Sequence, residues 1–149
     1  MKLSPPAVPL LICALAPLTF AQDLPEGKGK DVVENVCGAC HGTDLISSQR
    51  ATKEGWSYIV DDMVSRGASA TNDQIQQIKA YLAKSFGQVN ANKGSAAELA
   101  QILEITPEQA DAIVKYRTDH GNFKTVDDVK KVPGLASANL DAKKDRLVY

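Results

Sequence analysis

The sequence has few aromatic residues, few cysteines and almost no net charge. Only 5% of its 149 residues are Phe, Trp or Tyr, so a large core would have to be aliphatic or be filled by something other than side chains. The formal charge of −1 excludes a strongly cationic nucleic-acid binder and an acidic disordered tail. Three cysteines are too few for a disulfide-stapled small protein. The length allows one domain or two very small ones.

The first 21 residues are typical of a secretory signal peptide. Lys2 provides a single positive charge at the N-terminus, and residues 10–18 form a short apolar run. Ala21 ends the stretch that a signal peptidase would recognise. An uncleaved anchor helix is the less favoured alternative, because the run is too short for roughly 30 Å of hydrocarbon and is interrupted by Pro17. We therefore expect export to a bacterial periplasm, cleavage after Ala21, and no transmembrane segment in the mature chain.

Removal of this segment leaves two cysteines, Cys37 and Cys40, with His41 directly after them. Two thiols separated by two residues and followed at once by histidine are what covalent haem attachment requires. Each thiol adds to one porphyrin vinyl group, and the histidine then lies under the iron. The alternatives are a redox dithiol, which needs no such histidine, and half of a zinc site, which needs two further ligands. The pattern favours one haem c, attached at Cys37 and Cys40 with His41 as an axial iron ligand.

Few residues of the mature chain could serve as the second axial ligand of the iron. Met63 is the only methionine of the mature chain, and His120 is its only other histidine. Haems that transfer electrons usually have His/Met or His/His ligands. Met63 lies on an amphipathic stretch, residues 52–66, where packing in the core is the alternative explanation for a methionine. We predict Met63 as the second axial ligand in preference to His120, with an open or water-bound iron as the remaining alternative.

Residues 31–86 resemble the short class I c-type cytochrome domain found in bacterial exported oxidoreductases. The residues that carry the resemblance are a first helix over 31–36, the haem motif, Leu45, Arg50, Trp56, Met63, Arg66-Gly67-Ala68 and a closing helix over 71–86. The resemblance implies a helical haem domain in which the first and last helices cross and Met63 approaches the porphyrin from the far side. Arg50 and Arg66 are then candidates to pair with the haem propionates, and Trp56 is a candidate to pack beside them.

Residues 87–94 predict a boundary, since they contain glycine and polar residues without periodicity. Three helix-start signals follow, at Ser95, Thr106 and Thr125; the first two look like capping boxes. Short amphipathic helices with tight connections predict a small all-α module with its own core. The two glycines of the linker favour a flexible joint between two separately folding units.

The second half of the chain, from Val89 to about Leu135, resembles the helix-hairpin-helix domain of the bacterial competence DNA receptor. The residues that carry the resemblance are 89–92, 95–99, 112–117, 121–129 and 132–135. In that family a glycine-rich hairpin offers backbone N–H groups to DNA phosphates. Here Glu104 and Thr106 stand in the first hairpin, and Pro133-Gly134 remains in the second. Lys130 and Lys131 are candidates for a local cationic patch beside it.

The sequence as a whole predicts an all-α protein in three parts: a signal peptide over 1–21, a small monohaem cytochrome c domain over 22–87 and a small helix-hairpin-helix domain over 88–149. The predicted function is electron transfer between periplasmic redox partners, such as a dehydrogenase or an oxidase, with the C-terminal domain as a docking element. No catalytic activity of its own is expected, because no nucleophile–base constellation is visible.

Two other hypotheses compete with electron transfer. One is a periplasmic DNA-binding module with an accessory haem domain. The charge of the C-terminal region argues against this hypothesis. Residues 88–149 hold nine basic and nine acidic side chains, whereas affinity for phosphates requires a cationic face. The other is a haem enzyme or sensor with an open iron site.

Overall fold

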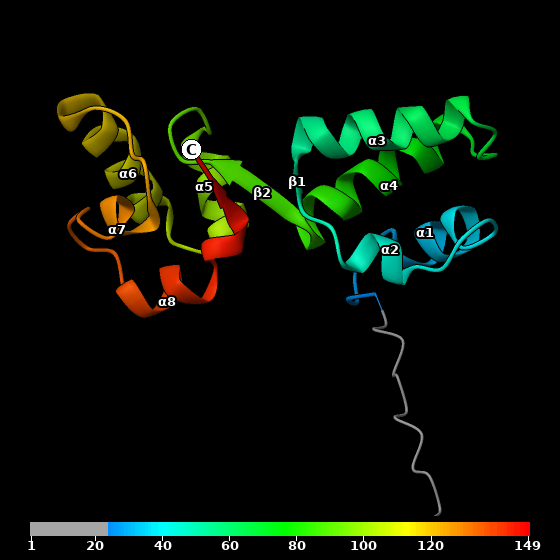
Figure 1. The fold of residues 1–149 in the computed structure, drawn as a ribbon, viewed down its shortest axis with the longest axis horizontal. Coiled ribbons are helices and arrows are strands. Elements are labelled where there is room, and N and C mark those ends of the chain that lie inside the picture. The colour runs from blue at the N-terminus through cyan, green and yellow to red at the C-terminus, as the bar shows by residue number, and fades with distance from the viewer. Residues whose placement is uncertain (1–23) are drawn as a thin grey trace, which may run out of the picture.

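The computed structural model describes residues 24–149, and the predicted signal peptide lies outside these residues. Two helical lobes lie side by side, joined by the strand β2 (Gly87–Asn90) (Figure 1). We call residues 24–86 the N-terminal lobe and residues 91–149 the C-terminal lobe. Helices dominate both lobes, which confirms the predicted all-α class. In the part of the chain that the structure describes, no helix has the length and apolar character needed to cross a membrane.

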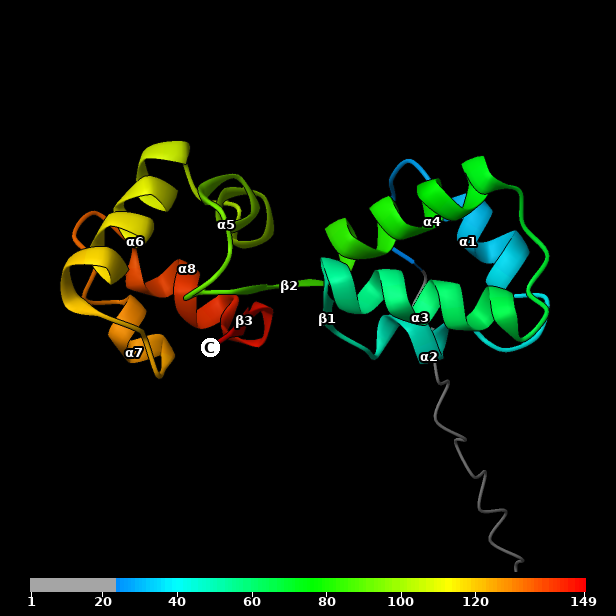
Figure 2. The ribbon, with the colours of Figure 1, turned by 90° about the horizontal axis from the view of Figure 1, so that it is seen from above.

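The N-terminal lobe contains four helices: α1 (Lys30–Cys37), α2 (Asp44–Ser47), α3 (Lys53–Ser65) and α4 (Asn72–Ser85). The long helices begin where the sequence provides caps, because the Thr52 hydroxyl accepts from the Gly55 amide and Thr71 forms a capping box with Gln74. Helix α3 lies alongside α4, and α1 packs on α4 (Figure 2). Their shared core includes the fully buried Trp56 and Ile78. The four-residue helix α2 was not predicted.

The C-terminal lobe contains α5 (Ala96–Leu103), α6 (Pro107–His120), α7 (Val126–Val129), α8 (Ser137–Ala142), a 3₁₀ turn (Lys144–Arg146) and β3 (Leu147–Val148). The predicted helix starts are confirmed: Ser95, Thr106 and Thr125 each form a capping box at the start of a helix. The helices enclose a second aliphatic core, and its most deeply buried members include Leu99 and Ile113.

The first half of the segment predicted to be a flexible linker, residues 87–90, forms part of a small parallel sheet instead. Strand β2 pairs with β1 (Ala51–Thr52) at Gly87 and Gln88 and with β3 at Val89 and Asn90. Gly87 is buried, and an added Cβ there would lie 1.9 Å from the Ala83 carbonyl oxygen and 2.7 Å from Ile102 Cδ1. The prediction of a flexible joint is therefore wrong for residues 87–90, because Gly87 provides close packing between the lobes rather than flexibility.

Candidate haem site and hairpin unit

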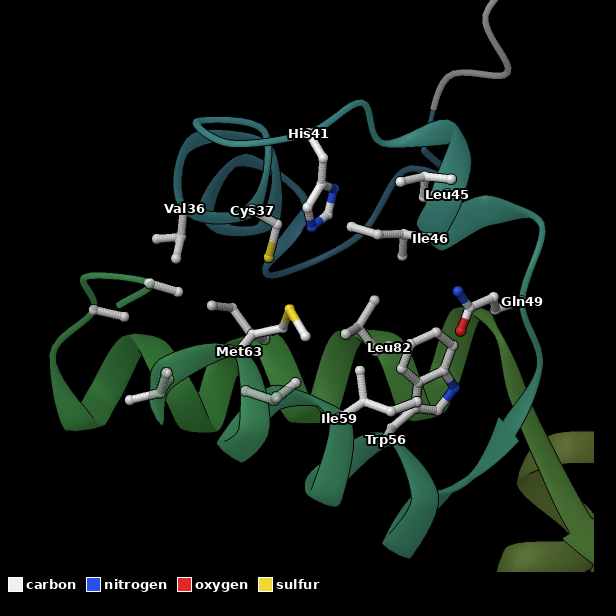
Figure 3. A pocket seen from close by; sticks show the side chains of 15 residues that line it. Val36, Cys37, His41, Leu45, Ile46, Gln49, Trp56, Ile59, Met63 and Leu82 are labelled. Atoms are coloured by element: carbon white, nitrogen blue, oxygen red, sulfur yellow. The ribbon is translucent and has the colours of Figure 1, made fainter. Parts of the chain in front are cut away.

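A cavity of about 280 Å³ opens in the N-terminal lobe, and several predicted haem residues lie on its wall (Figure 3). Its lining comes from all four helices of the lobe and from the loops beside them. The lining residues are mostly aliphatic: Val36, Leu45, Ile46, Ile59, Val60, Val64, Ala68, Ala70, Ile78 and Leu82. A concave apolar surface with a few polar groups is typical of a site for an organic cofactor.

Cys37 is the last residue of α1, and it lines this cavity. Gly38 follows in a turn so tight that an added Cβ would lie 2.3 Å from the Glu34 carbonyl oxygen. Cys37 is half-buried and lines the cavity, whereas Cys40 is exposed and is not among the lining residues. Burial raises the pKa of the Cys37 thiol. Redox-active dithiols depend on a lowered thiol pKa, so this environment disfavours the dithiol alternative.

The imidazole of His41 is oriented by its own neighbour in the chain. Its Nδ1 atom lies 3.2 Å from the carbonyl oxygen of Gly42. Because a carbonyl only accepts, this hydrogen bond places the proton on Nδ1 and leaves the lone pair on Nε2. The ring lines the cavity, and Figure 3 shows it pointing into the same space as the sulfur atoms of Cys37 and Met63. A histidine held in this way is suited to bind a metal through Nε2.

Of the two candidates for the second axial ligand, the structure brings Met63 to the cavity. Met63 lies on α3 and lines the wall on the side opposite His41 (Figure 3). His120 lies at the end of α6 in the C-terminal lobe, where its ring stacks on Tyr116 with a centroid distance of 4.0 Å. Its Nδ1 atom is 3.1 Å from the Tyr116 carbonyl oxygen. His120 is therefore engaged away from the cavity.

The three residues proposed to lie near the propionates have different surroundings. Trp56 lines the cavity, and its indole Nε1 donates to the Phe86 carbonyl oxygen at 3.0 Å. Arg50 is stacked over the Phe86 ring at 5.3 Å, and Arg66 pairs with Asp62 at 2.8 Å. Neither arginine is among the residues that line the cavity. The packing role of Trp56 therefore fits the structure, whereas the propionate role of the arginines has no support from it.

Sequence reasoning missed Gln49, which contributes an amide to the cavity wall. It lies just after α2 and belongs to no motif, so no local signal distinguishes it from other loop residues. Within residues 24–149, no three His, Cys, Asp or Glu side chains gather in a group that could hold a metal ion.

The first hairpin of the C-terminal lobe, between α5 and α6, contains a glutamate that forms a salt bridge. Glu104 ends α5 with a φ of 52°, a left-handed conformation that favours glycine. Its carboxylate pairs with the Lys143 ammonium at 2.5 Å. This hydrogen bond and the charge of Lys143 lower the pKa of Glu104. A carboxylate at this position would repel a phosphate group.

The second hairpin has the backbone geometry expected there, but its lysines are already paired. Gly134 has a φ of 84°, and its carbonyl oxygen accepts from Gln109 Nε2 at 2.8 Å. Lys130 pairs with two aspartates at 2.5 and 3.0 Å, and Lys131 pairs with Asp128 at 2.7 Å. The hydrogen bond from Lys131, followed by that from the Lys124 amide, lowers the pKa of Asp128 to about 2. Acidic neighbours thus offset the predicted cationic patch.

Two protein families match the chain. The family described as "Quinohemoprotein amine dehydrogenase A, alpha subunit, haem binding" matches residues 27–111. The family described as "Helix-hairpin-helix motif" matches residues 84–148, which confirms the predicted helix-hairpin-helix unit. The two matches overlap over residues 84–111, the part of the chain that contains β2 and α5.

Individual proteins are also similar to the chain. An uncharacterized protein of Haemophilus influenzae is 27% identical over 115 residues, which cover 76% of this chain and 92% of that protein. ComE operon protein 1 of Bacillus subtilis is 34% identical over 59 residues, which cover 40% of this chain and 29% of that protein. Endonuclease/exonuclease/phosphatase family domain-containing protein 1 of Bos taurus is 37% identical over 54 residues, which cover 36% of this chain and 10% of that protein. No solved structure matches the chain significantly.

Proposed function

Because the chain belongs to the haem-binding family of the quinohemoprotein amine dehydrogenase A alpha subunit, we propose that it is a monohaem c-type cytochrome that carries single electrons between exported redox proteins. The observation that carries the proposal is the arrangement of three side chains on one apolar wall. The Cys37 thiol, the His41 imidazole and the Met63 thioether line the same cavity. These are the groups that a covalently attached, six-coordinate haem requires.

Each residue has a separate role in this proposal. Cys37 and Cys40 would tether the porphyrin by thioether bonds, and His41 and Met63 would hold the iron from its two sides. When bound, haem supplies one-electron redox chemistry at its iron. The contact from His41 Nδ1 to Gly42 keeps the imidazole oriented, and the aliphatic walls would keep water away from a bound haem.

The setting of this activity is part of the same proposal. We propose export to a bacterial periplasm, with residues 1–21 as the cleaved signal, and a dehydrogenase or an oxidase as the redox partner. The chain would have no catalytic activity of its own. The C-terminal lobe would serve as a docking element for that partner.

Covalent attachment tests the proposal directly. Expressed in cells that attach haem to exported proteins, the full chain should keep its haem after denaturation in detergent. The variant Cys37→Ala/Cys40→Ala should lose it, because no thioether can form. Tyr58→Phe, an exposed position outside the cavity lining, serves as the matched control and should keep full haem staining. Absence of haem from the unaltered chain would reject the proposal.

DNA binding by the C-terminal lobe is the second candidate function, with the haem lobe as an accessory. The helix-hairpin-helix match over residues 84–148 favours it, as does the similarity to ComE operon protein 1. These two comparisons bear on DNA binding more directly than any comparison bears on electron transfer. The exposed Pro133-Gly134 turn is where backbone N–H groups would meet phosphates.

The salt dependence of binding tests this second function. If the lobe binds duplex DNA, its affinity should fall steeply as salt rises, since lysines that contact phosphates release counterions. Lys130→Gln/Lys131→Gln should reduce the slope of log affinity against log salt by about 1 to 2. Lys79→Gln, in the N-terminal lobe, should leave the slope unchanged. No measurable affinity at low salt would remove DNA from consideration.

A further inference from the structure

We propose that Asp145, in the C-terminal lobe, is a positioning residue for the haem cavity of the N-terminal lobe. It acts through Arg50, whose guanidinium lies between Asp145 and the Phe86 ring. The inference rests on the proposed haem function. It concerns a contact between two residues that lie 95 positions apart in the chain, one in each lobe.

Arg50 connects the end of α2 to the C-terminal lobe. Its Nη1 group donates to the carbonyl oxygens of Ser47 and Gln49, at 2.9 and 2.7 Å. Its guanidinium carbon lies 5.3 Å from the centre of the Phe86 ring. Its Nε atom is buried without a hydrogen-bond partner and lies 3.6 Å from a carboxylate oxygen of Asp145. This carboxylate is the acidic group that balances the Arg50 charge.

The backbone carbonyls and the aromatic ring that contact Arg50 are part of the cavity wall or adjoin it. Ile46 and Gln49, which line the cavity, lie on either side of the Ser47 carbonyl in the chain. Phe86, beneath the guanidinium, accepts the indole hydrogen bond of Trp56, another lining residue. A change in the position of Arg50 would therefore move two parts of the wall.

The chain around Asp145 makes further contacts with strand β2 and with the N-terminal lobe. Its carbonyl oxygen accepts from Gln88 Nε2 at 2.8 Å. The next residue, Arg146, donates from Nη2 to the Ser85 carbonyl oxygen at 3.0 Å, at the end of α4. The last carbonyls of a helix lack partners within the helix, and a cation there is favourable. Strand β3 then pairs with β2, as the position of the C-terminus in Figure 1 also shows.

The ion pair also sets the charge near the cavity. About a third of the Arg50 side chain is exposed, and more than half of Asp145 is, so solvent screens the pair in part. Reduction lowers the positive charge at the iron. An unbalanced Arg50 cation would therefore favour the reduced state, and an unbalanced Asp145 anion would favour the oxidised state.

The test compares the reduction potential and the local backbone protection of matched variants of the full chain. In the haem-loaded Asp145→Asn variant, the ferrous-to-ferric ratio at a fixed applied potential should rise about twofold. For a one-electron couple this corresponds to an increase of about 18 mV in the reduction potential. Arg50→Gln should lower this ratio, and Asp145→Glu should restore it. Asp127→Asn is the matched control. It removes one negative charge from an aspartate that pairs with Lys130 rather than with Arg50, so it should leave the ferrous-to-ferric ratio unchanged.

Amide hydrogen exchange gives a second readout that needs no haem. Exchange at residues 46–49 should be faster in Asp145→Asn than in the unaltered chain or in Asp127→Asn. Unchanged exchange together with an unchanged potential would overturn the proposal. A chain that takes up no haem would reject the proposed function instead, and the exchange measurement would still decide whether Asp145 positions the wall.

Discussion

Replacing Met63 by alanine should lower the reduction potential of the haem-loaded chain by about one to a few tenths of a volt. This is a substantial part of the roughly 0.8 V that axial ligands can span. The thioether is the ligand that raises the potential, and it lines the wall opposite His41. The variant should also lose the weak red absorption band of methionine-ligated ferric haem, and its reduced form should bind carbon monoxide quickly.

Two control variants separate ligation from packing. Val64→Ala alters the next residue of α3, which lines the same cavity but has no ligand atom, so its spectrum and potential should stay close to those of the unaltered chain. His120→Ala should also change neither property, because His120 stacks on Tyr116 in the C-terminal lobe. If Met63→Ala behaved like Val64→Ala, Met63 would be a packing residue and the iron would have another ligand.

Replacing Gly87 by alanine should destabilise the whole molecule by about 3 kcal/mol and lower its melting temperature by roughly 10 °C. The added Cβ would meet the Ala83 carbonyl oxygen at 1.9 Å and Ile102 Cδ1 at 2.7 Å. The contact with the Ala83 carbonyl oxygen cannot be relieved by moving a side chain, because that atom belongs to the backbone. The strand would have to move away from α4, α5 or both.

Gly27→Ala is the matched control for this substitution. Its added Cβ would lie 3.6 Å from the ring of Tyr81, an ordinary contact distance, so its melting curve should be nearly unchanged. Thermal unfolding followed by circular dichroism measures both variants. If Gly87→Ala were as stable as the unaltered chain, the connection between the lobes would be a flexible joint, as its sequence suggests, and β2 would add little to stability.

The features that the sequence determined by itself are local ones. The spacing of Cys37, Cys40 and His41 can be read without knowledge of the fold, because the three residues lie within five consecutive positions of the chain. The starts of α5, α6 and α7 were predicted because a capping box lies within four consecutive residues. The apolar face of α3 likewise follows from helical periodicity, and Met63 lies on it.

The tertiary structure alone decided the features that depend on distant partners. Strand β2 exists because residues 51–52 and 147–148 lie on its two sides, and strands of two residues leave no pattern in a sequence. Arg50 has no recognisable role until Asp145 and Phe86 surround it. Lys130 looked like part of a cationic patch until Asp141 was brought beside it. A local pattern records the neighbours of a residue in the chain, whereas burial and charge balance depend on neighbours that only folding supplies.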